Sequence, residues 1–303
     1  MRDRCFISRF QRSEMSFGLP IPGALPQAIT FCALGAQPEM DILSEIIASK
    51  RSRVEVAKSA LPLAELRPMA LEARNHAKSH ALRDALSRND DTLNIIAEFK
   101  RRSPSKGLIR ENADAATIAR SYESGGAAAI SVLTEEDYFA GSLADLRAVR
   151  EVVAIPILRK DFIFDEYQVF ESALARAAAL LLIVAALDDE TLARLLRLTE
   201  DELGMDALVE VHTKEEMERA VAQGAKLIGV NNRDLHTFNV STETSVQLAQ
   251  FAPAATVLVS ESGLTPDEVC KLHGIGYKGF LVGEALMRAP EPAQQLRAFR
   301  GEN

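Results

Sequence analysis

The feature that most constrains the fold of this chain is an alternation of short apolar runs with amphipathic stretches from Ile95 to near the C-terminus. Strand-length apolar runs without polar alternation are typical of parallel strands that are covered on both faces. We expect strands at Ile95–Phe99, Ala129–Leu133, Ile155–Arg159, Ala179–Val184, Ala207–Val211, Leu227–Val230, Thr256–Ser260 and Gly279–Val282.

Helical stretches separate these strands and imply parallel pairing with right-handed crossovers. They are expected near Ala113–Glu123, Leu143–Val153, Asp165–Ala177, Asp188–Leu203, Thr213–Gln223, Thr242–Gln250, Pro266–His273 and Pro292–Arg300. A doubly wound sheet usually has fewer strands and a GxGxxG fingerprint, and this chain lacks the fingerprint. The sequence therefore predicts the α/β class, as a single (β/α)8 TIM barrel.

The segment before the first strand divides into two parts. Residues 1–39 show no periodic pattern and are expected to be a disordered extension or an artefact of start-site choice. From Asp41 to about Ser59 the apolar positions recur with helical period, and Asp41 or Ser44 is a candidate helix cap. A second, shorter helical region should reach about Ser87. Residues 40–303 are therefore predicted to form one barrel domain with extra N-terminal helices.

Composition excludes several classes of function. The net charge of −8 argues against a nucleic-acid-binding surface, and no apolar run reaches the length of a membrane-spanning helix. Three scattered cysteines indicate neither a disulfide framework nor a zinc site. His76 and His80 have i,i+4 spacing on an expected helix, but no third ligand is evident, so a solvated helix face is the default interpretation.

Polar residues gather where the predicted strands end. In a (β/α)8 barrel the carboxyl ends of the strands carry the active site, whereas here the opposite ends are mainly glycine and alanine turns. The polar sets are Glu98-Phe99-Lys100, Thr134–Phe139, Lys160-Asp161-Phe162, Glu210, Asn231–Asp234, Ser260–Gly263 and Gly283-Glu284. Charge placed at one end of successive strands is difficult to explain as scattered surface charge, so we expect a catalytic site there.

The first strand shows this polarity most clearly. Glu98 and Lys100 have the same parity, so both side chains should point to one face of the strand. A surface ion pair is the alternative interpretation, but the pattern on the other strands favours a site. The basic segment Arg101–Gly107 that follows is expected to be a mobile lid over an anionic substrate.

Glycines after the last two strands predict an anion site. Backbone N–H groups at Ser262-Gly263 and Gly283-Glu284 can form a nest for phosphate, which commonly binds at this place in the architecture. The negative charge of Glu284 is unfavourable there, so its side chain is expected to point away.

Several segments together resemble one known family. They are IIAEFKRRSPSKG (95–107), SVLTEEDYFAGS (131–142), PILRKDFIFDEYQV (156–169), LLIVAAL (181–187), ALVEVHT (207–213), IGVNNRDL (228–235), SESGL (260–264) and FLVGEALM (280–287). From Met40 to about Arg300, the chain resembles indole-3-glycerol phosphate synthases in the order and spacing of these segments.

The resemblance implies a carboxy-lyase of tryptophan biosynthesis. Its substrate would be 1-(2-carboxyphenylamino)-1-deoxyribulose 5-phosphate, a phosphorylated, anthranilate-derived small molecule. The ring carbon bearing the carboxylate attacks the ketone, and CO2 and then water are lost. The family uses no cofactor and no metal. A cytoplasmic enzyme with no nucleic-acid or membrane partner is expected. The sequence does not determine the oligomeric state, and a monomer is the working expectation.

The resemblance also implies catalytic roles. Lys160 would be the general acid at the carbonyl, and Lys100, paired with Glu98, would hold substrate anions and assist a proton step. Glu210 and Glu98 would supply the base and acid for the later steps, and Asn231 would orient the substrate. Which group carries which proton stays open. Because Lys100, Lys160 and Arg233 converge, we also expect the lysine pKa values to be lowered.

The remaining implied roles concern substrate binding. Arg233 and Ser103 would bind the benzoate carboxylate, and Glu261 would line the site. The apolar slot would consist of Phe99, Phe139, Phe162 and Leu181, and phosphate would bind at Ser262, Gly263, Gly283 and the backbone of Glu284.

One departure and three alternatives remain. The family usually has Gly-Ala-Asp where this chain has Arg176-Ala177-Ala178, at the non-catalytic end, so we expect an effect on stability or a turn. The enzyme alternatives are phosphoribosylanthranilate isomerase and the tryptophan synthase alpha barrel. The helices before the first strand and the lysine pair argue against both. A catalytically inactive ligand-binding barrel is disfavoured because every matched catalytic position is filled.

Overall fold

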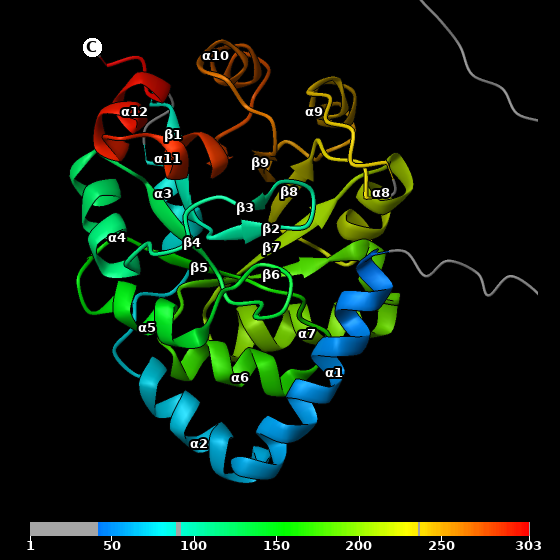
Figure 1. The fold of residues 1–303 in the computed structure, drawn as a ribbon. Coiled ribbons are helices and arrows are strands. Elements are labelled where there is room, and N and C mark those ends of the chain that lie inside the picture. Colours follow the sequence, from blue (N-terminus) through cyan, green and yellow to red (C-terminus); the bar gives the residue numbers. More distant parts are fainter. Residues whose placement is uncertain (1–41, 89–91, 236, 303) are drawn as a thin grey trace, which may run out of the picture. The chain divides into compact units, whose positions relative to one another are not determined.

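Eight parallel strands close into a barrel in the computed structural model, which describes residues 42–88, 92–235 and 237–302 (Figure 1). The barrel strands are β1 (Asn94–Phe99), β4 (Ala129–Leu133), β5 (Ile157–Lys160), β6 (Ala179–Ile183), β7 (Asp206–Val211), β8 (Leu227–Asn231), β9 (Val257–Glu261) and β10 (Gly279–Val282). They pair in chain order, and β10 closes the barrel against β1. The predicted (β/α)8 TIM barrel is confirmed. The prediction for residues 1–39 and the cap at Asp41 lie outside the described residues.

Helices on the outside of the barrel follow the strands, and those from α4 to α10 connect one strand to the next. They are α4 (Ala115–Ser124), α5 (Leu143–Arg150), α6 (Glu166–Leu174), α7 (Asp189–Arg197), α8 (Lys214–Ala222), α9 (Glu243–Ala249), α10 (Pro266–His273), the short α11 (Glu284–Arg288) and α12 (Pro292–Phe299). Side-chain oxygens accept from first-turn N–H groups at six of their N-termini, which explains where these helices begin. The capping residues are Asp114, Ser142, Asp165, Asp188, Thr213 and Thr265.

Strand parity separates an inner core from an outer core. Ile96, Leu158 and Leu208 belong to the cluster inside the barrel, whereas Ile95 and Val132 belong to the cluster between the strands and the helices. Side chains alternate between the two faces of a strand, so inward positions continue to the polar residues at the strand ends. This register brings the predicted catalytic side chains to one mouth of the barrel.

The same parity makes the prediction for Phe99 wrong. Phe99 neighbours the inward-facing Glu98 and therefore points outward. Its ring is 1% exposed in the outer core, and the guanidinium of Arg101 lies 4.8 Å from its centroid. Phe99 therefore supports the loop that follows β1 and does not line the cavity at the barrel mouth.

Three helices precede the barrel, namely α1 (Ile42–Ala60), α2 (Leu63–Arg74) and α3 (Ala81–Leu86). Leu82 and Leu86 of α3 join the inner core, and the backbone N–H groups of Leu82 and Arg83 donate to Asp206 at the start of β7. Helix α3 therefore closes the amino-terminal end of the barrel. His80 does not lie on a helix face as predicted, because it adopts a left-handed backbone before α3 and its ring nitrogen Nδ1 lies 3.3 Å from Asp206.

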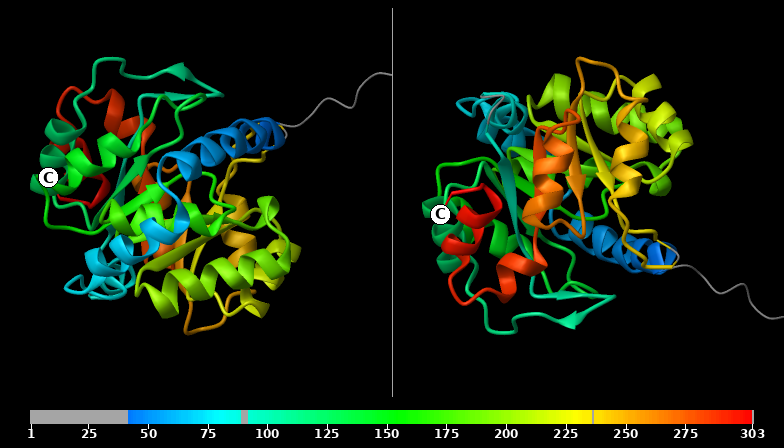
Figure 2. Two further views of the ribbon diagram at one scale, coloured as in Figure 1. Left: turned by 90° about the horizontal axis from the view of Figure 1, so that it is seen from below. Right: turned by 90° about the horizontal axis from the view of Figure 1, so that it is seen from above.

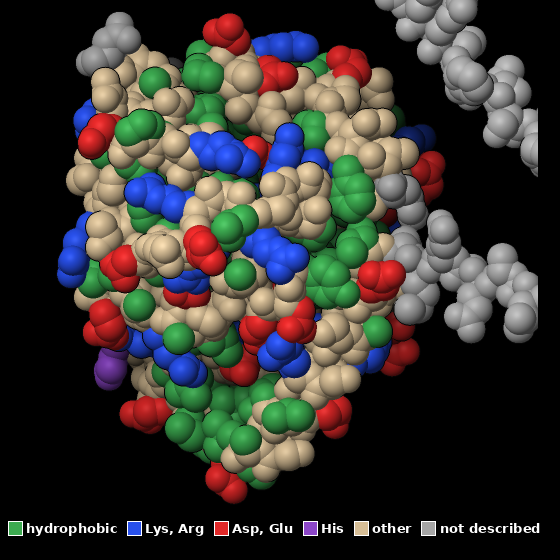
Figure 3. Space-filling model, in the orientation of Figure 1, with side chains coloured by type: hydrophobic (Ala, Val, Ile, Leu, Met, Phe, Trp, Pro, Cys, Tyr) green, Lys and Arg blue, Asp and Glu red, His purple; other side chains and the backbone are tan. Residues whose placement is uncertain are grey.

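The segment after β1 contains a small antiparallel hairpin, β2 (Arg102–Ser103) and β3 (Gly107–Leu108). Arg101 anchors its base because both terminal guanidinium nitrogens lie 2.7 Å from the carboxylate of Asp145. The views in Figure 2 show the hairpin and α1 as separate elements beside the strands. Several basic side chains lie near the middle of the face shown in Figure 3. Within the hairpin segment, Arg102 and Lys106 are exposed. The mobility expected of this segment stays a prediction.

The described residues contain neither a membrane-spanning helix nor a cluster of metal-ligating side chains. No helix in the described ranges is long and apolar enough to span a membrane. No group of three or more His, Cys, Asp and Glu side chains is arranged to hold a metal ion within the part of the chain that the structure describes.

Candidate active site

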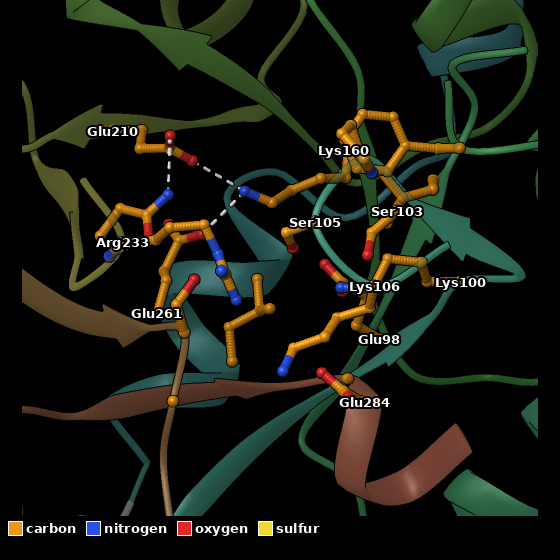
Figure 4. A pocket seen from close by; sticks show the side chains of 18 of the residues that line it. Glu98, Lys100, Ser103, Ser105, Lys106, Lys160, Glu210, Arg233, Glu261 and Glu284 are labelled. Atoms are coloured by element: carbon orange, nitrogen blue, oxygen red, sulfur yellow. Dashed lines mark hydrogen bonds and ion pairs between the residues drawn. The ribbon is translucent and has the colours of Figure 1, made fainter. Parts of the chain in front are cut away.

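A cavity of about 860 Å³ opens at the carboxyl ends of the strands, and all eight barrel strands contribute to its lining (Figure 4). Helix α1 adds Ile42, Leu43 and Ile46, and the hairpin adds its turn, residues 104–106. The cavity brings together nearly all of the predicted site residues: Glu98, Lys100, Ser103, Phe139, Lys160, Phe162, Leu181, Glu210, Asn231, Arg233, Glu261, Ser262, Gly263, Gly283 and Glu284.

Lys160 lies at the centre of the polar side of this cavity. It ends β5, and its ammonium Nζ lies 2.8 Å from Glu210 Oε2 on β7 and 2.7 Å from Glu261 Oε2 on β9. The two carboxylates are almost fully buried, and the lysine side chain is 12% exposed. A buried ammonium between two carboxylates is a charged proton donor held in one place, because each ion pair restricts its side chain.

The carboxylates determine the protonation states of this cluster. Burial alone would lower the pKa of Lys160, but the charges of Glu210, Glu261 and Glu98 outweigh burial and raise it. The expectation of a lowered lysine pKa is therefore wrong for Lys160, because the nearby carboxylates dominate over the nearby cations. Burial favours the neutral form of Glu210, yet Lys160 and His212 lower its pKa strongly. Burial and the charge of Glu210 raise the pKa of Glu261 to about 7, against the attraction of Lys160.

A second ion pair lies across the cavity from this cluster. Lys100 Nζ lies 2.5 Å from Glu98 Oε1, and both side chains are largely buried. The two residues point to the same face of the chain, as their parity predicted. The pair therefore belongs to the cavity and is not a surface ion pair.

Polar side chains at the end of β8 complete the polar wall. Asn231 donates through Nδ2 to Glu210 Oε1 at 3.1 Å and accepts from the backbone N–H of Arg233 at 3.0 Å. Asn231 therefore orients Glu210 and also restrains the chain that carries Arg233. The guanidinium of Arg233 donates to the carbonyl of Phe238 at 3.2 Å and lines the cavity.

The predicted anion site follows β9 and β10. Ser262 and Gly263 both have positive φ, at 69° and 72°, so two successive residues adopt the left-handed conformation. A non-glycine residue in this region is strained, and such strain is often found at ligand-binding turns. Asn232 stabilises the turn by donating to the Ser262 carbonyl at 3.2 Å. The carboxylate of Glu284 accepts from Arg288 at 3.0 Å, which offsets the negative charge that was unfavourable in the sequence.

An apolar wall faces the ion pairs. Phe139 and Phe162 contact each other with ring centroids 6.1 Å apart and planes tilted by 40°. Leu181 from the inner core continues this wall, together with Leu133 and Ile183. One cavity therefore joins an apolar wall, a buried ammonium and a turn suited to an anion.

Comparison with known proteins identifies the family. The family model for indole-3-glycerol phosphate synthase matches residues 43–299. A protein of this name from Carboxydothermus hydrogenoformans is 48% identical over 261 residues, which cover 85% of this chain and 98% of that protein. Another from Micrococcus luteus is 47% identical over 262 residues, covering 86% of this chain and 97% of that protein.

The chain belongs to the indole-3-glycerol phosphate synthase family.

Solved structures with much lower sequence identity to this indole-3-glycerol phosphate synthase family member share its barrel fold. Thiamine phosphate pyrophosphorylase from Pyrococcus furiosus is 17% identical, with a TM-score of 0.53, covering 71% of this chain and 96% of that one. KGPDC from Streptococcus mutans is 16% identical, with a TM-score of 0.56, covering 69% of this chain and 95% of that one. At these identities the likeness concerns the barrel alone.

Two glycines make room for the carboxylates of this family member. A Cβ atom on Gly229 of β8 would lie 2.2 Å from Glu261 Oε1. A Cβ atom on Gly283 would lie 2.4 Å from Glu98 Oε1. Any side chain at either position would displace a carboxylate. The sequence predicts Gly283 only as part of a phosphate site, and no sequence pattern indicates Gly229.

A buried network outside the barrel supports Lys160. The carboxylate of Asp161 lies 2.9 Å from Arg159 Nη2 and 2.9 Å from Lys50 Nζ of α1. Thr134 donates to the same carboxylate at 2.6 Å. Lys50 therefore connects α1, which lines the cavity, to the strand end that carries Lys160. No sequence pattern indicated Lys50.

Proposed function

We propose that this member of the indole-3-glycerol phosphate synthase family converts 1-(2-carboxyphenylamino)-1-deoxyribulose 5-phosphate into indole-3-glycerol phosphate, CO2 and water. The observation that carries the proposal is the buried ammonium of Lys160 between Glu210 and Glu261, opposite the apolar wall of Phe139 and Phe162. Family membership supports the same conclusion.

The first step needs a proton donor at the ketone. As the ring carbon bearing the carboxylate attacks, negative charge develops on the carbonyl oxygen, and a nearby charged donor stabilises it. Lys160 is assigned this role because its ion pairs keep it protonated. A new C–C bond forms, and CO2 then leaves with its bonding electrons remaining in the ring, which restores aromaticity.

The second step removes water from the resulting indoline. One acid protonates the departing hydroxyl, and one base takes a proton from the carbon beside nitrogen. The two carboxylate–lysine pairs can divide this work, with Glu98 and Lys100 on one side and Glu210 on the other. Asn231 orients Glu210 by its hydrogen bond.

Binding follows the remaining features of the cavity. Arg233 suits the planar benzoate carboxylate, which accepts two parallel hydrogen bonds from a guanidinium, and buried Ser103 adds a hydroxyl. The aromatic ring would lie against Phe139, Phe162 and Leu181. Phosphate would bind at the turn of Ser262 and Gly263, with Gly283 and the backbone of Glu284. A cytoplasmic, monomeric enzyme that needs neither cofactor nor metal is part of the proposal.

The direct test is the reaction itself. Purified protein is mixed with the proposed substrate, and the appearance of indole fluorescence is followed, with CO2 release measured in parallel. Stoichiometric release of both products supports the proposal. A folded protein that yields neither product would refute it and favour the ligand-binding alternative.

A further inference from the structure

A second cavity of about 450 Å³ lies beside the active site and shares Asn231 and Arg233 with it. Exposed residues such as Thr213, Thr237 and Asn239 line this cavity, so it is open to solvent. Its remaining polar lining includes His212, which follows β7. The proposed mechanism has not used His212.

His212 lies between the two cavities. Its Nε2 atom is 3.3 Å from Glu210 Oε1 and is shielded from solvent, without a well-aligned hydrogen bond. Its Nδ1 atom is 3.2 Å from Glu216 Oε2 on α8. Glu216 also accepts from the backbone N–H of His212 at 2.7 Å, which fixes the position of the imidazole. The side chains therefore form a line from the second cavity to the reaction site, in the order Glu216, His212, Glu210 and Lys160.

The stoichiometry of the proposed reaction requires a proton from solvent. The protein donates two protons to the substrate, one to the carbonyl oxygen and one to the departing hydroxyl. It takes back one proton, from the carbon beside nitrogen. Because the substrate carboxylate leaves as neutral CO2, each turnover consumes one proton. A substrate that fills the main cavity hinders water there, so the proton needs another entrance.

We propose that His212 is a positioning residue and proton relay that orients Glu210 and returns the consumed proton from the second cavity, through Glu210, to Lys160. This inference rests on the proposed function. The transfer is balanced: His212 passes the Nε2 proton to Glu210, Glu210 passes it to the neutral amine of Lys160, and water in the second cavity reprotonates the imidazole.

The electrostatics of the surrounding groups support the direction of transfer. Burial would lower the pKa of His212, but the close carboxylates of Glu210 and Glu216 raise it to about 10, so the imidazole is charged at neutral pH. The other charged groups of the second cavity are Arg233 and Asp234. When Lys160 has given up its proton, its positive charge no longer stabilises the Glu210 carboxylate. The proton affinity of Glu210 then rises and favours transfer from His212.

The test compares the first turnover with later turnovers. Stopped-flow indole fluorescence is recorded with excess substrate for the wild type and for His212→Gln, which keeps an amide donor but cannot relay a proton. The protein starts fully protonated, so the first turnover should keep its rate, whereas kcat should fall about tenfold with little change in KM. Imidazole added to His212→Ala should raise kcat.

Controls separate the relay from a structural role. His76→Gln makes the same substitution at an exposed histidine and should leave all rates unchanged. Glu216→Gln should give the His212→Gln pattern in weaker form, and it keeps the proposal testable if His212→Gln does not fold. Either of two results would overturn the relay and leave the proposed function standing. One is an unchanged kcat in His212→Gln. The other is a first turnover that slows together with kcat, with no rescue of His212→Ala by imidazole. An inactive wild type would overturn the proposed function and the relay with it.

Discussion

Replacing Glu261 by glutamine should stabilise the protein at alkaline pH while reducing its activity. Glu261 is 1% exposed on β9, between Lys160 and the space left by Gly229. Its carboxylate has one ion pair with Lys160, but burial and the charge of Glu210 disfavour ionisation more strongly. Glutamine keeps the shape and an acceptor for Lys160 but carries no charge to bury.

The magnitude follows from the pKa of Glu261, which rises from an ordinary value of 4.5 to about 7 on folding. The unfolded chain releases this proton from about pH 4.5 upward, whereas the folded protein retains it until about pH 7. The raised pKa therefore lowers the free energy of unfolding progressively across this window. Each pKa unit corresponds to about 1.4 kcal/mol, so the full cost above pH 7 is about 3 kcal/mol.

The assay is urea denaturation of wild type and Glu261→Gln, followed by circular dichroism at several pH values. The two proteins should have similar free energies of unfolding at about pH 4, and the variant should be more stable by about 3 kcal/mol at about pH 8. Its kcat should fall at least about tenfold, because the ion pair that positions Lys160 is weakened. A difference in stability that does not change with pH, or a variant less stable at pH 8, would refute the electrostatic reasoning.

Three further substitutions test other parts of the structure. Gly229→Ala places a methyl group against the Glu261 carboxylate, so kcat should fall about 100-fold in steady-state assays. Wild-type activity in this variant would show that the Glu261 carboxylate does not need the space beside Gly229. Arg176 has a positive φ of 63°, which glycine adopts without strain, and its exposed ion pair with Glu151 contributes little. Thermal denaturation of Arg176→Gly should therefore show about 1 kcal/mol of stabilisation with unchanged kcat. A loss of stability would show that the backbone is not strained. Lys50→Met removes the connection between α1 and Asp161, so KM should rise more than kcat falls, and an unchanged KM would mean that α1 needs no such anchor.

The alternation of strands and helices was sufficient to predict the barrel and the end that carries the site. Periodicity reports which faces are buried, and barrel geometry then places every strand end together. The same parity that correctly paired Glu98 with Lys100 should have excluded Phe99, which the resemblance had suggested for the aromatic slot.

Other properties depend on distances that no local pattern encodes. The raised pKa of Lys160 reflects carboxylates from β1, β7 and β9, which are far apart in the chain. Gly229 matters only because Glu261 points at it from the neighbouring strand. The position of His212 between Glu210 and Glu216 likewise depends on how α8 packs after β7. Long-range electrostatics and close packing therefore required the three-dimensional structure.

In the proposed reaction, Lys160 is kept charged by Glu210 and Glu261 and donates the proton for ring closure. The most direct test of this role is kcat of Lys160→Ala in the indole fluorescence assay, with circular dichroism to establish that the variant is folded. The kcat of this variant should fall about 10²- to 10⁴-fold, with a much smaller change in KM. A folded Lys160→Ala protein that retains most of the wild-type kcat would contradict this role.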